Sequence, residues 1–241
     1  MKLGWLLLTV GLLVSACGSN GPVSGSADVI ATDVVLLGAV QKSGLKAPIS
    51  SAVMATDLQR LFAGQVGTSV TPVADARQII GQLPHDEMMA FYARNAFFAP
   101  YQVQRLMAAN LPARRALAVR LGADVVERLP MRQEALIDTQ GRLIANRERR
   151  VFVTRRVTQL SATMLDLRNG RVIWSRQYRV SPEAVTASDH RSGESFGASV
   201  AAAVANTLVQ GIGETDYPPP PILNYSVQRL LQEVVLNAPL N

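Results

Sequence analysis

The most informative pattern in the sequence is a series of apolar runs whose spacing alternates between strand-like and helix-like. Residues Val34–Val40 form an apolar run rich in β-branched side chains, which is typical of a strand buried on both faces. Beyond it, apolar side chains recur at i, i+4, i+7 and i+8, which predicts a helix whose buried stripe is Met54, Leu58, Leu61 and Phe62. We expect Ser50 or Ser51 to cap this helix and Gly64 to end it.

The following segment predicts one more strand and further helices. Thr68–Val73 fits a short strand, and Asp75 is expected to cap a helix over Ala76–Ile80. Residues 87–109 are predicted to be helical, with methionine and aromatic side chains typical of a core and an interruption at Pro100.

A junction is predicted near residue 122. Pro112 fits the first turn of a helix that runs through Leu121, and Gly122 is placed to end that helix. We expect a strand over Ala123–Leu129 to follow.

The strongest β signal is a long hairpin. Val151–Leu165 and Val172–Val180 are rich in Val, Thr, Ile, Trp and Tyr, and the segment between them contains Asn-Gly, a frequent hairpin turn. A two-residue turn would place Arg168 opposite Arg171, which is an unfavourable pair of like charges. We therefore expect a longer loop that begins at Asp166.

The end of the chain predicts two helices separated by polar and proline-rich segments. A polar loop is expected over Ser181–Glu194, and helical spacing then relates Phe196, Val200, Val204, Thr207 and Leu208. Pro218–Pro221 is typical of a semi-rigid spacer. A second apolar stripe, formed by Val227, Leu230, Leu231, Val234 and Val235, must be buried against the domain itself or against a partner.

These patterns predict an α/β (α+β) fold. We expect a single mixed sheet with a long antiparallel hairpin, helices packed on it, and a C-terminal amphipathic helix. With 241 residues, the chain is long enough for one domain with appendages.

The first 17 residues resemble the leader of a bacterial lipoprotein. Lys2 precedes an apolar stretch from Leu3 to Val14, and Ser15 and Ala16 lead directly to Cys17, the only cysteine. The resemblance implies a signal peptide over 1–16, lipidation of Cys17 and anchoring in a membrane. Since Gly18 follows the cysteine, the resemblance implies the periplasmic face of the outer membrane.

The resulting domain organisation has four parts. Residues 1–16 are expected to be the signal peptide, 17–29 a lipidated tether, 30–213 a periplasmic α/β domain, and 214–241 a proline-rich spacer with the C-terminal helix.

Short motifs add a second resemblance. The segment Leu121-Gly122-Ala123-Asp124 and the pattern D-x-x-x-G-x-x-x-W-S, occupied by Asp166, Gly170, Trp174 and Ser175, are similar to motifs of an α/β family of envelope lipoproteins. That family includes the curli secretion protein CsgG, the penicillin-binding-protein activator LpoB and the N-terminal domain of TolB. The resemblance implies a non-catalytic scaffold, assembly factor or regulator, in which Trp174 serves packing.

Composition excludes several classes of protein. One cysteine permits no disulfide within the chain, and two histidines without further cysteines do not make the usual zinc site, so we expect no metal and no cofactor. With 48% hydrophobic and 17% charged residues, the chain is too apolar for intrinsic disorder.

Two motifs suggest chemistry, and we consider both weak. Gly193-Glu194-Ser195-Phe196-Gly197 matches the nucleophile elbow of hydrolases, but the preceding residues look unlike a strand and no histidine follows position 190. His85-Asp86-Glu87 could offer metal ligands, but adjacent side chains diverge, and we expect Asp86 to cap the helix that follows. We therefore expect no catalytic residues and no enzyme.

Charge is concentrated in the hairpin region. From Arg105 to Arg191 there are 17 arginines against eight Asp and Glu residues, whereas acidic residues outnumber basic ones elsewhere. Arginine suits carboxylates and phosphates, although arginines on an exposed strand also keep a sheet soluble. We expect partner contacts at two sets of residues, the arginines of the hairpin and the apolar stripe of the last helix, namely Arg150, Arg155, Arg156, Arg176, Arg179, Leu230, Leu231 and Val234.

The sequence therefore favours a membrane-anchored protein that binds an envelope protein or another copy of itself. The alternative is a binding module for anionic glycan or lipid that uses the same arginines. Nucleic acid is not expected as a partner, because an exported lipoprotein does not routinely meet it.

Overall fold

The structure is a computed structural model, and it describes residues 34–65, 67–191 and 216–240. In chain order its elements are β1 (Val34–Gln41), α1 (Ser51–Ala63), β2 (Val70–Thr71), α2 (Val73–Ile80), α3 (Gln82–Asn95), α4 (Pro100–Ala108), β3 (Arg115–Arg128), β4 (Arg132–Ile137), β5 (Leu143–Asp166), β6 (Arg171–Val180), β7 (Glu183–Arg191) and α6 (Leu223–Asn237). Within the described residues, one open mixed sheet of seven strands carries helices and ends in the C-terminal helix α6. The expected fold class is therefore confirmed.

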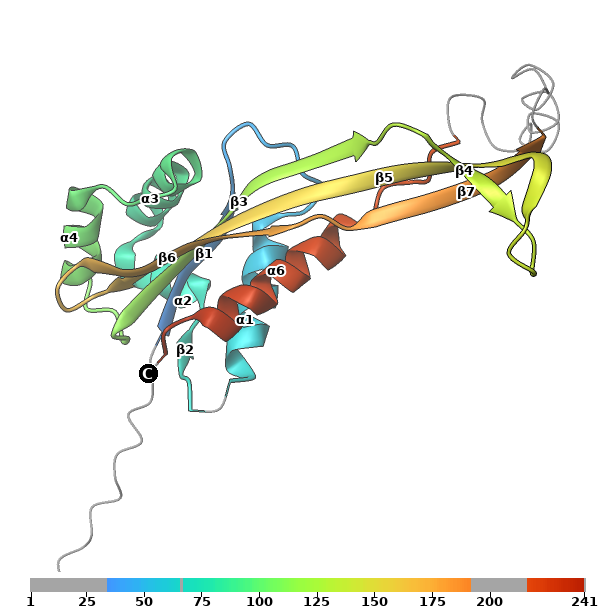
Figure 1. The fold of residues 1–241 in the computed structure, drawn as a ribbon. Coiled ribbons are helices and arrows are strands. Elements are labelled where there is room, and N and C mark those ends of the chain that lie inside the picture. The colour runs from blue at the N-terminus through green and yellow to red at the C-terminus, as the bar shows by residue number, and fades with distance from the viewer. Residues whose placement is uncertain (1–33, 66, 192–215, 241) are drawn as a thin grey trace, which may run out of the picture. The chain divides into compact units, whose positions relative to one another are not determined.

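The sheet is organised around the long strand β5 (Figure 1). The C-terminal half of β5 lies between β3 and β6, and β3 continues through β1 to β2, which are the parallel members of the sheet. The N-terminal half of β5 lies between β4 and β7. One strand therefore supports both halves of the sheet.

The two faces of the sheet carry separate apolar clusters. Leu160, Ala162 and Met164 of β5 face a cluster that includes side chains of α1 and α6, whereas Leu165 faces a second cluster with α2, α3 and α4. Successive side chains of a strand point to opposite faces, so both faces are buried where helices cover them. The helices are thus divided between the two faces, as Figure 1 shows.

The β5–β6 turn has the longer loop that the charge argument favours. Asp166 pairs with Arg171, so Arg168 does not lie opposite Arg171, and the Asp166 carboxylate accepts a hydrogen bond of 2.8 Å from the Arg168 amide. Gly170 has a φ of 67°, and a Cβ added there would lie 2.7 Å from side-chain atoms of Val103 and Met107 in α4. Glycine is required at this position both for the turn and for its contact with α4.

One predicted helix is wrong. The segment Pro112–Leu121 was expected to be helical and to end at Gly122, but Arg115–Arg128 forms the continuous strand β3, with a shift of register between Leu121 and Ala123. This strand is buried on both faces at its start, so its apolar side chains are nearly continuous. Periodicity alone does not distinguish such a run from a buried helix.

A predicted loop is also wrong. Most of Ser181–Glu194 was expected to be polar loop, yet Glu183–Arg191 forms β7, antiparallel to the N-terminal half of β5. The strand is polar because most of its described side chains are exposed, so it lacks the apolar alternation of a half-buried strand.

The predicted helix caps have mixed outcomes. Ser50 caps α1, with its side chain accepting from the Val53 amide at 3.2 Å. Asp75 lies inside the first turn of α2, which begins after Pro72. Asp86 lies within α3 and forms an ion pair with Arg77 of α2, so it is not a cap.

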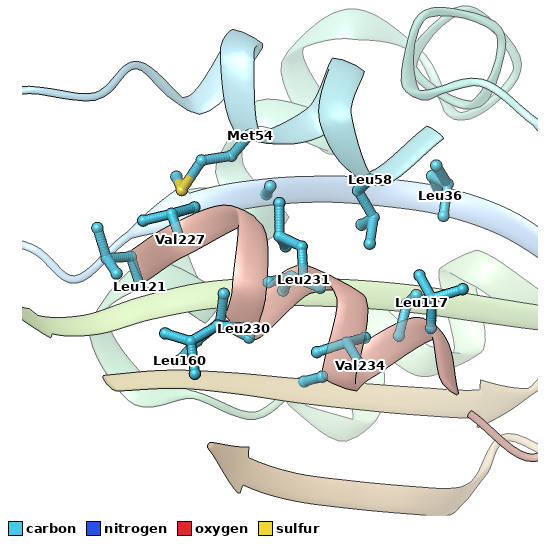
Figure 2. Close-up of a cluster of buried hydrophobic side chains, with 14 of the residues drawn as sticks. Leu36, Met54, Leu58, Leu117, Leu121, Leu160, Val227, Leu230, Leu231 and Val234 are labelled. Atoms are coloured by element: carbon cyan, nitrogen blue, oxygen red, sulfur yellow. The ribbon is translucent and has the colours of Figure 1, made fainter. Parts of the chain in front are cut away.

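Helix α6 packs on its own domain, so its apolar stripe is not free for a partner (Figure 2). Leu230 is 1% exposed, and Leu231 and Val234 are fully buried among β1, β3, β5 and α1. The expectation that these three side chains contact a partner is therefore corrected. The burial of α6 joins the C-terminal segment to the same core as the sheet.

Trp174 and Tyr178 of β6 lie half-buried against this cluster, with ring centroids 6.3 Å apart.

In the described residues, no helix is both long and apolar enough to cross a membrane. The expected helix near Phe196–Leu208 falls outside the described residues.

We predict that Leu231→Ala lowers the free energy of unfolding by about 2–5 kcal/mol, because it removes a fully buried side chain and leaves a cavity. Urea denaturation of the full chain measures this change. The matched control is Leu236→Ala on the same helix, which should change the free energy by less than about 0.5 kcal/mol, because Leu236 is 73% exposed. Equal effects of the two variants would contradict the observed docking of α6.

Candidate binding surface

Two of the arginines expected to meet a partner are neutralised within the chain. The Arg150 guanidinium lies 2.9 Å from a carboxylate oxygen of Glu148, and that of Arg155 lies 2.6 Å from one of Glu183. Glu183 belongs to β7, directly opposite Arg155 on β5. Ion pairs along β5, for Arg150, and between β5 and β7, for Arg155, therefore neutralise part of the positive charge that the sequence places in this region.

Arg156 has an internal structural role. Its guanidinium lies 3.2 Å from the Asp124 carboxylate and donates a hydrogen bond of 2.7 Å to the carbonyl of Pro221, just before α6. The side chains of Arg156 and Asp124 are only 12% and 7% exposed. Arg156 thus joins β5, β3 and the segment that leads into α6, and it is not a free contact residue.

Of the arginines expected to meet a partner, Arg176 and Arg179 remain exposed. Both lie on β6, and neither forms an ion pair with a described residue. Within the described residues, β6 pairs only with β5, so its other edge is open. Val172 and Ile173, at the start of β6, are 57% and 42% exposed. We define the β6 surface as the open edge of β6 with its exposed side chains Val172, Ile173, Arg176 and Arg179. Because side chains alternate along a strand, Arg176 and Arg179 project from opposite faces of the sheet.

A cleft adjoins the end of this strand. It has a volume of about 270 Å³ and lies between the β6–β7 junction and the start of α6. Its lining comprises Arg179, Val180, Ser181, Pro182, Tyr225, Ser226 and Arg229. We call this the β6–α6 cleft.

Sequence reasoning missed the α6 side of this cleft. Tyr225 and Arg229 are four residues apart, so they share the exposed side of a helix whose opposite side is buried. Because the apolar stripe of α6 is apparent in the sequence, the exposed side of the helix opposite to it can be predicted from the sequence. The position of Arg229 beside β6 could not be read from the chain, because it depends on how α6 docks.

The suspected metal-ligand cluster has other roles. His85 is 4% exposed, and its Nε2 donates to the carbonyl of Leu37 at 2.7 Å. Asp86 accepts two hydrogen bonds from Arg77, which lower the pKa of its carboxyl. Among the described residues, no group of three or more His, Cys, Asp or Glu side chains could hold a metal ion.

Two other sequence candidates fall outside the described residues, namely Cys17 and the motif Gly193–Gly197 with Ser195. One argument against that motif is corrected, because Glu183–Arg191 is a strand and not a loop. The second argument, the lack of a histidine after position 190, is unaffected.

Comparison with other proteins gives only distant structural similarity. No protein-family model matches the chain, and no curated protein matches it. Among solved structures, the LpoB C-terminal domain from Salmonella enterica is 10% identical, with a TM-score of 0.36, covering 62% of this chain and 82% of that domain.

Two further structures are similar at the same level. Lipoprotein GNA1162 from Neisseria meningitidis is 12% identical, with a TM-score of 0.32, covering 75% of this chain and 99% of that protein. A putative neuraminyllactose-binding hemagglutinin homolog from Helicobacter pylori is 13% identical, with a TM-score of 0.37, covering 86% of both chains. TM-scores below 0.5 transfer no function to this chain.

We predict that Arg156→Gln lowers the free energy of unfolding by about 3–5 kcal/mol, because it leaves the Asp124 carboxylate buried without its partner. Chemical denaturation of the full chain measures this loss. Arg149→Gln is the control, since it breaks the exposed Arg149–Asp189 pair, and exposed pairs contribute little. A similar stability loss in both variants would contradict the anchoring role of Arg156.

Proposed function

We propose that the chain is a lipid-anchored protein of the bacterial cell envelope that binds a protein partner without catalysing a reaction. The partner is another envelope protein or a second copy of this chain, and the role is that of a scaffold, assembly factor or regulator. The anchor is Cys17, at the end of the signal-peptide-like segment, and residues 17–29 form the tether. Gly18 supports the periplasmic face of the outer membrane as the location.

The observation that carries this proposal is the β6 surface. An edge strand presents backbone amides and carbonyls to solvent, which is one way in which proteins recruit an extended segment of a partner. Within the described residues, β6 has such an open edge, and its exposed Arg176 and Arg179 are not neutralised by ion pairs. A partner with acidic side chains complements this charge.

A second candidate function is binding of an anionic glycan or lipid by these arginines, Arg176 on one face of β6 and Arg179 on the other. Arginine guanidinium groups form paired hydrogen bonds with carboxylates and phosphates, whatever molecule carries them. The exposed guanidinium groups of Arg176 and Arg179 favour this candidate as well as the first.

We predict that Cys17→Ser abolishes incorporation of a labelled fatty acid and leaves the precursor unprocessed, because serine lacks the thiol that is acylated. Metabolic labelling followed by gel electrophoresis of whole cells measures both effects. The control is Ser15→Ala, which keeps a small residue before the cysteine and should be labelled normally. Labelling of the Cys17→Ser chain would refute the lipid anchor.

We also predict that a photo-crosslinking amino acid at Ile173 captures the protein partner in intact cells, because Ile173 lies on the β6 surface. Charge reversal by Arg176→Glu should reduce the crosslink severalfold, and mass spectrometry identifies the captured protein. The control position is Leu83 on α3, which is 75% exposed and distant in sequence from β6. Absence of a crosslink at Ile173, or one unaffected by Arg176→Glu, would remove the β6 surface as the docking site.

A further inference from the structure

Three exposed apolar side chains lie on α3, on α4 and in the turn between these helices. Leu83 at the start of α3, Phe97 in the turn and Tyr101 in α4 are 75%, 55% and 59% exposed. Tyr101 lines a small cleft together with Pro84, the neighbour of Leu83. The ring of Phe97 packs edge-on against Phe91 of α3, with ring centroids 5.6 Å apart. We define the α3–α4 surface as Leu83, Phe91, Phe97 and Tyr101.

The backbone at the end of α3 separates two neighbouring phenylalanine rings. Ala96 has a φ of 62°, a left-handed conformation that is costly for a residue with a side chain. Beyond it, Phe98 is 8% exposed and stacks on the buried Tyr92, whereas Phe97 remains in solvent. Single exposed apolar side chains are common, but a group of them drawn from three segments is typical of a contact surface.

The α3–α4 surface lies at the end of the sheet where the chain enters it. Arg115, the first residue of β3, pairs with Val34 at the start of β1 and with Asp166 at the end of β5. The turn that follows Asp166 lies against α4 at Gly170. The entry of the chain and α4 therefore share one end of the sheet, and β4 lies toward the other end (Figure 1).

Chain length restricts how the domain can face the membrane that holds the proposed lipid anchor. The segment from Cys17 to Val34 spans at most about 60 Å when fully extended. The strand β5, with 24 residues, spans about 80 Å. The β4 end of the sheet therefore cannot point straight at this membrane, because Val34 would then be too far from the anchor. The end that carries the α3–α4 surface is under no such restriction.

We propose that the α3–α4 surface lies against the bilayer that holds the lipid anchor, with Leu83, Phe97 and Tyr101 at the boundary between headgroups and acyl chains. This inference rests on the anchor of the proposed function and adds an orientation of the domain. Aromatic and leucine side chains favour this boundary, and nearby arginines attract anionic headgroups. Arg94 of α3 and Arg105 of α4 are exposed, and neither forms an ion pair with a described residue. The contact leaves the β6 surface free for a protein partner.

The test uses the full chain, purified with its acyl groups and reconstituted in vesicles of phosphatidylethanolamine and phosphatidylglycerol. Acylation blocks the thiol of Cys17, the only cysteine, so Leu83→Cys provides the only site for a thiol-reactive fluorophore. We expect spin-labelled lipids to quench this fluorophore at least twofold more than one attached at Leu143→Cys. Leu143 is the matched control, because it is 72% exposed and begins β5 at the other end of the sheet.

A second variant tests whether the surface acts as a unit. Phe97→Ser combined with Tyr101→Ser should reduce quenching of the Leu83→Cys fluorophore at least twofold, because it removes two of the side chains that enter the bilayer. Both side chains are more than half exposed, so thermal unfolding of this variant should remain close to that of the parent chain. Quenching that is unchanged in this variant would overturn the proposal.

The intact mass of the purified chain separates this inference from the anchor on which it rests. An acylated chain whose Leu83→Cys fluorophore is quenched no more than the one at Leu143→Cys would overturn the membrane contact and leave the anchor standing. A chain without acyl groups would overturn the anchor, and the membrane contact with it. Capture of a protein by a photo-crosslinking amino acid at Leu83 in intact cells would assign this surface to a protein and would also overturn the proposal.

Discussion

The antiparallel pairing of β5 with its neighbours is the interaction on which the rest of the structure depends. β5 spans Leu143–Asp166 and pairs with β3 and β6 along one half and with β4 and β7 along the other. Its register fixes which side chains reach each face, because a slip of one residue would exchange the two faces. With that register, Leu160 and Met164 meet α1 and α6, and the Thr163 hydroxyl meets that of Tyr92 at 3.1 Å on the other face.

Arg156 extends the influence of β5 to the candidate cleft. Its backbone amide donates to the carbonyl of Pro182 at the β6–β7 junction, and its guanidinium donates to the carbonyl of Pro221 before α6. Both sides of the cleft are therefore held by the same residue. The charge of Arg156 is balanced by the Asp124 carboxylate, so the residue positions the cleft without adding free charge to it.

The sequence was most informative where one face of an element is exposed. The stripe of α1, the hairpin over β5 and β6, and the helix α6 follow periodic patterns that residue spacing reveals. The sequence pattern does not identify β3, because Ala116, Leu117, Ala118 and Val119 are all buried, which removes the alternation that marks a strand. It does not identify β7 for the opposite reason, since exposed polar side chains are typical of a loop as well.

The candidate site was harder to predict than the fold, because charge along the chain does not show which charges are already paired. Arg155 forms its ion pair with Glu183 because β5 pairs with β7, and the sequence does not indicate that β7 is a strand. The same limit applies to Leu230 and Leu231, since an apolar stripe requires burial but does not specify what covers it.

The arginines of β6 oppose non-specific pairing of its open edge with the edges of other sheets. An exposed edge strand can pair with the edge of any other sheet, and charged side chains and proline are common means of preventing this. Arg176 and Arg179 carry like charges along the strand, and Pro182 separates β6 from β7. Two such edges repel each other, whereas an acidic segment is attracted. The feature that limits indiscriminate pairing of β6 therefore also selects the charge of any partner that binds there.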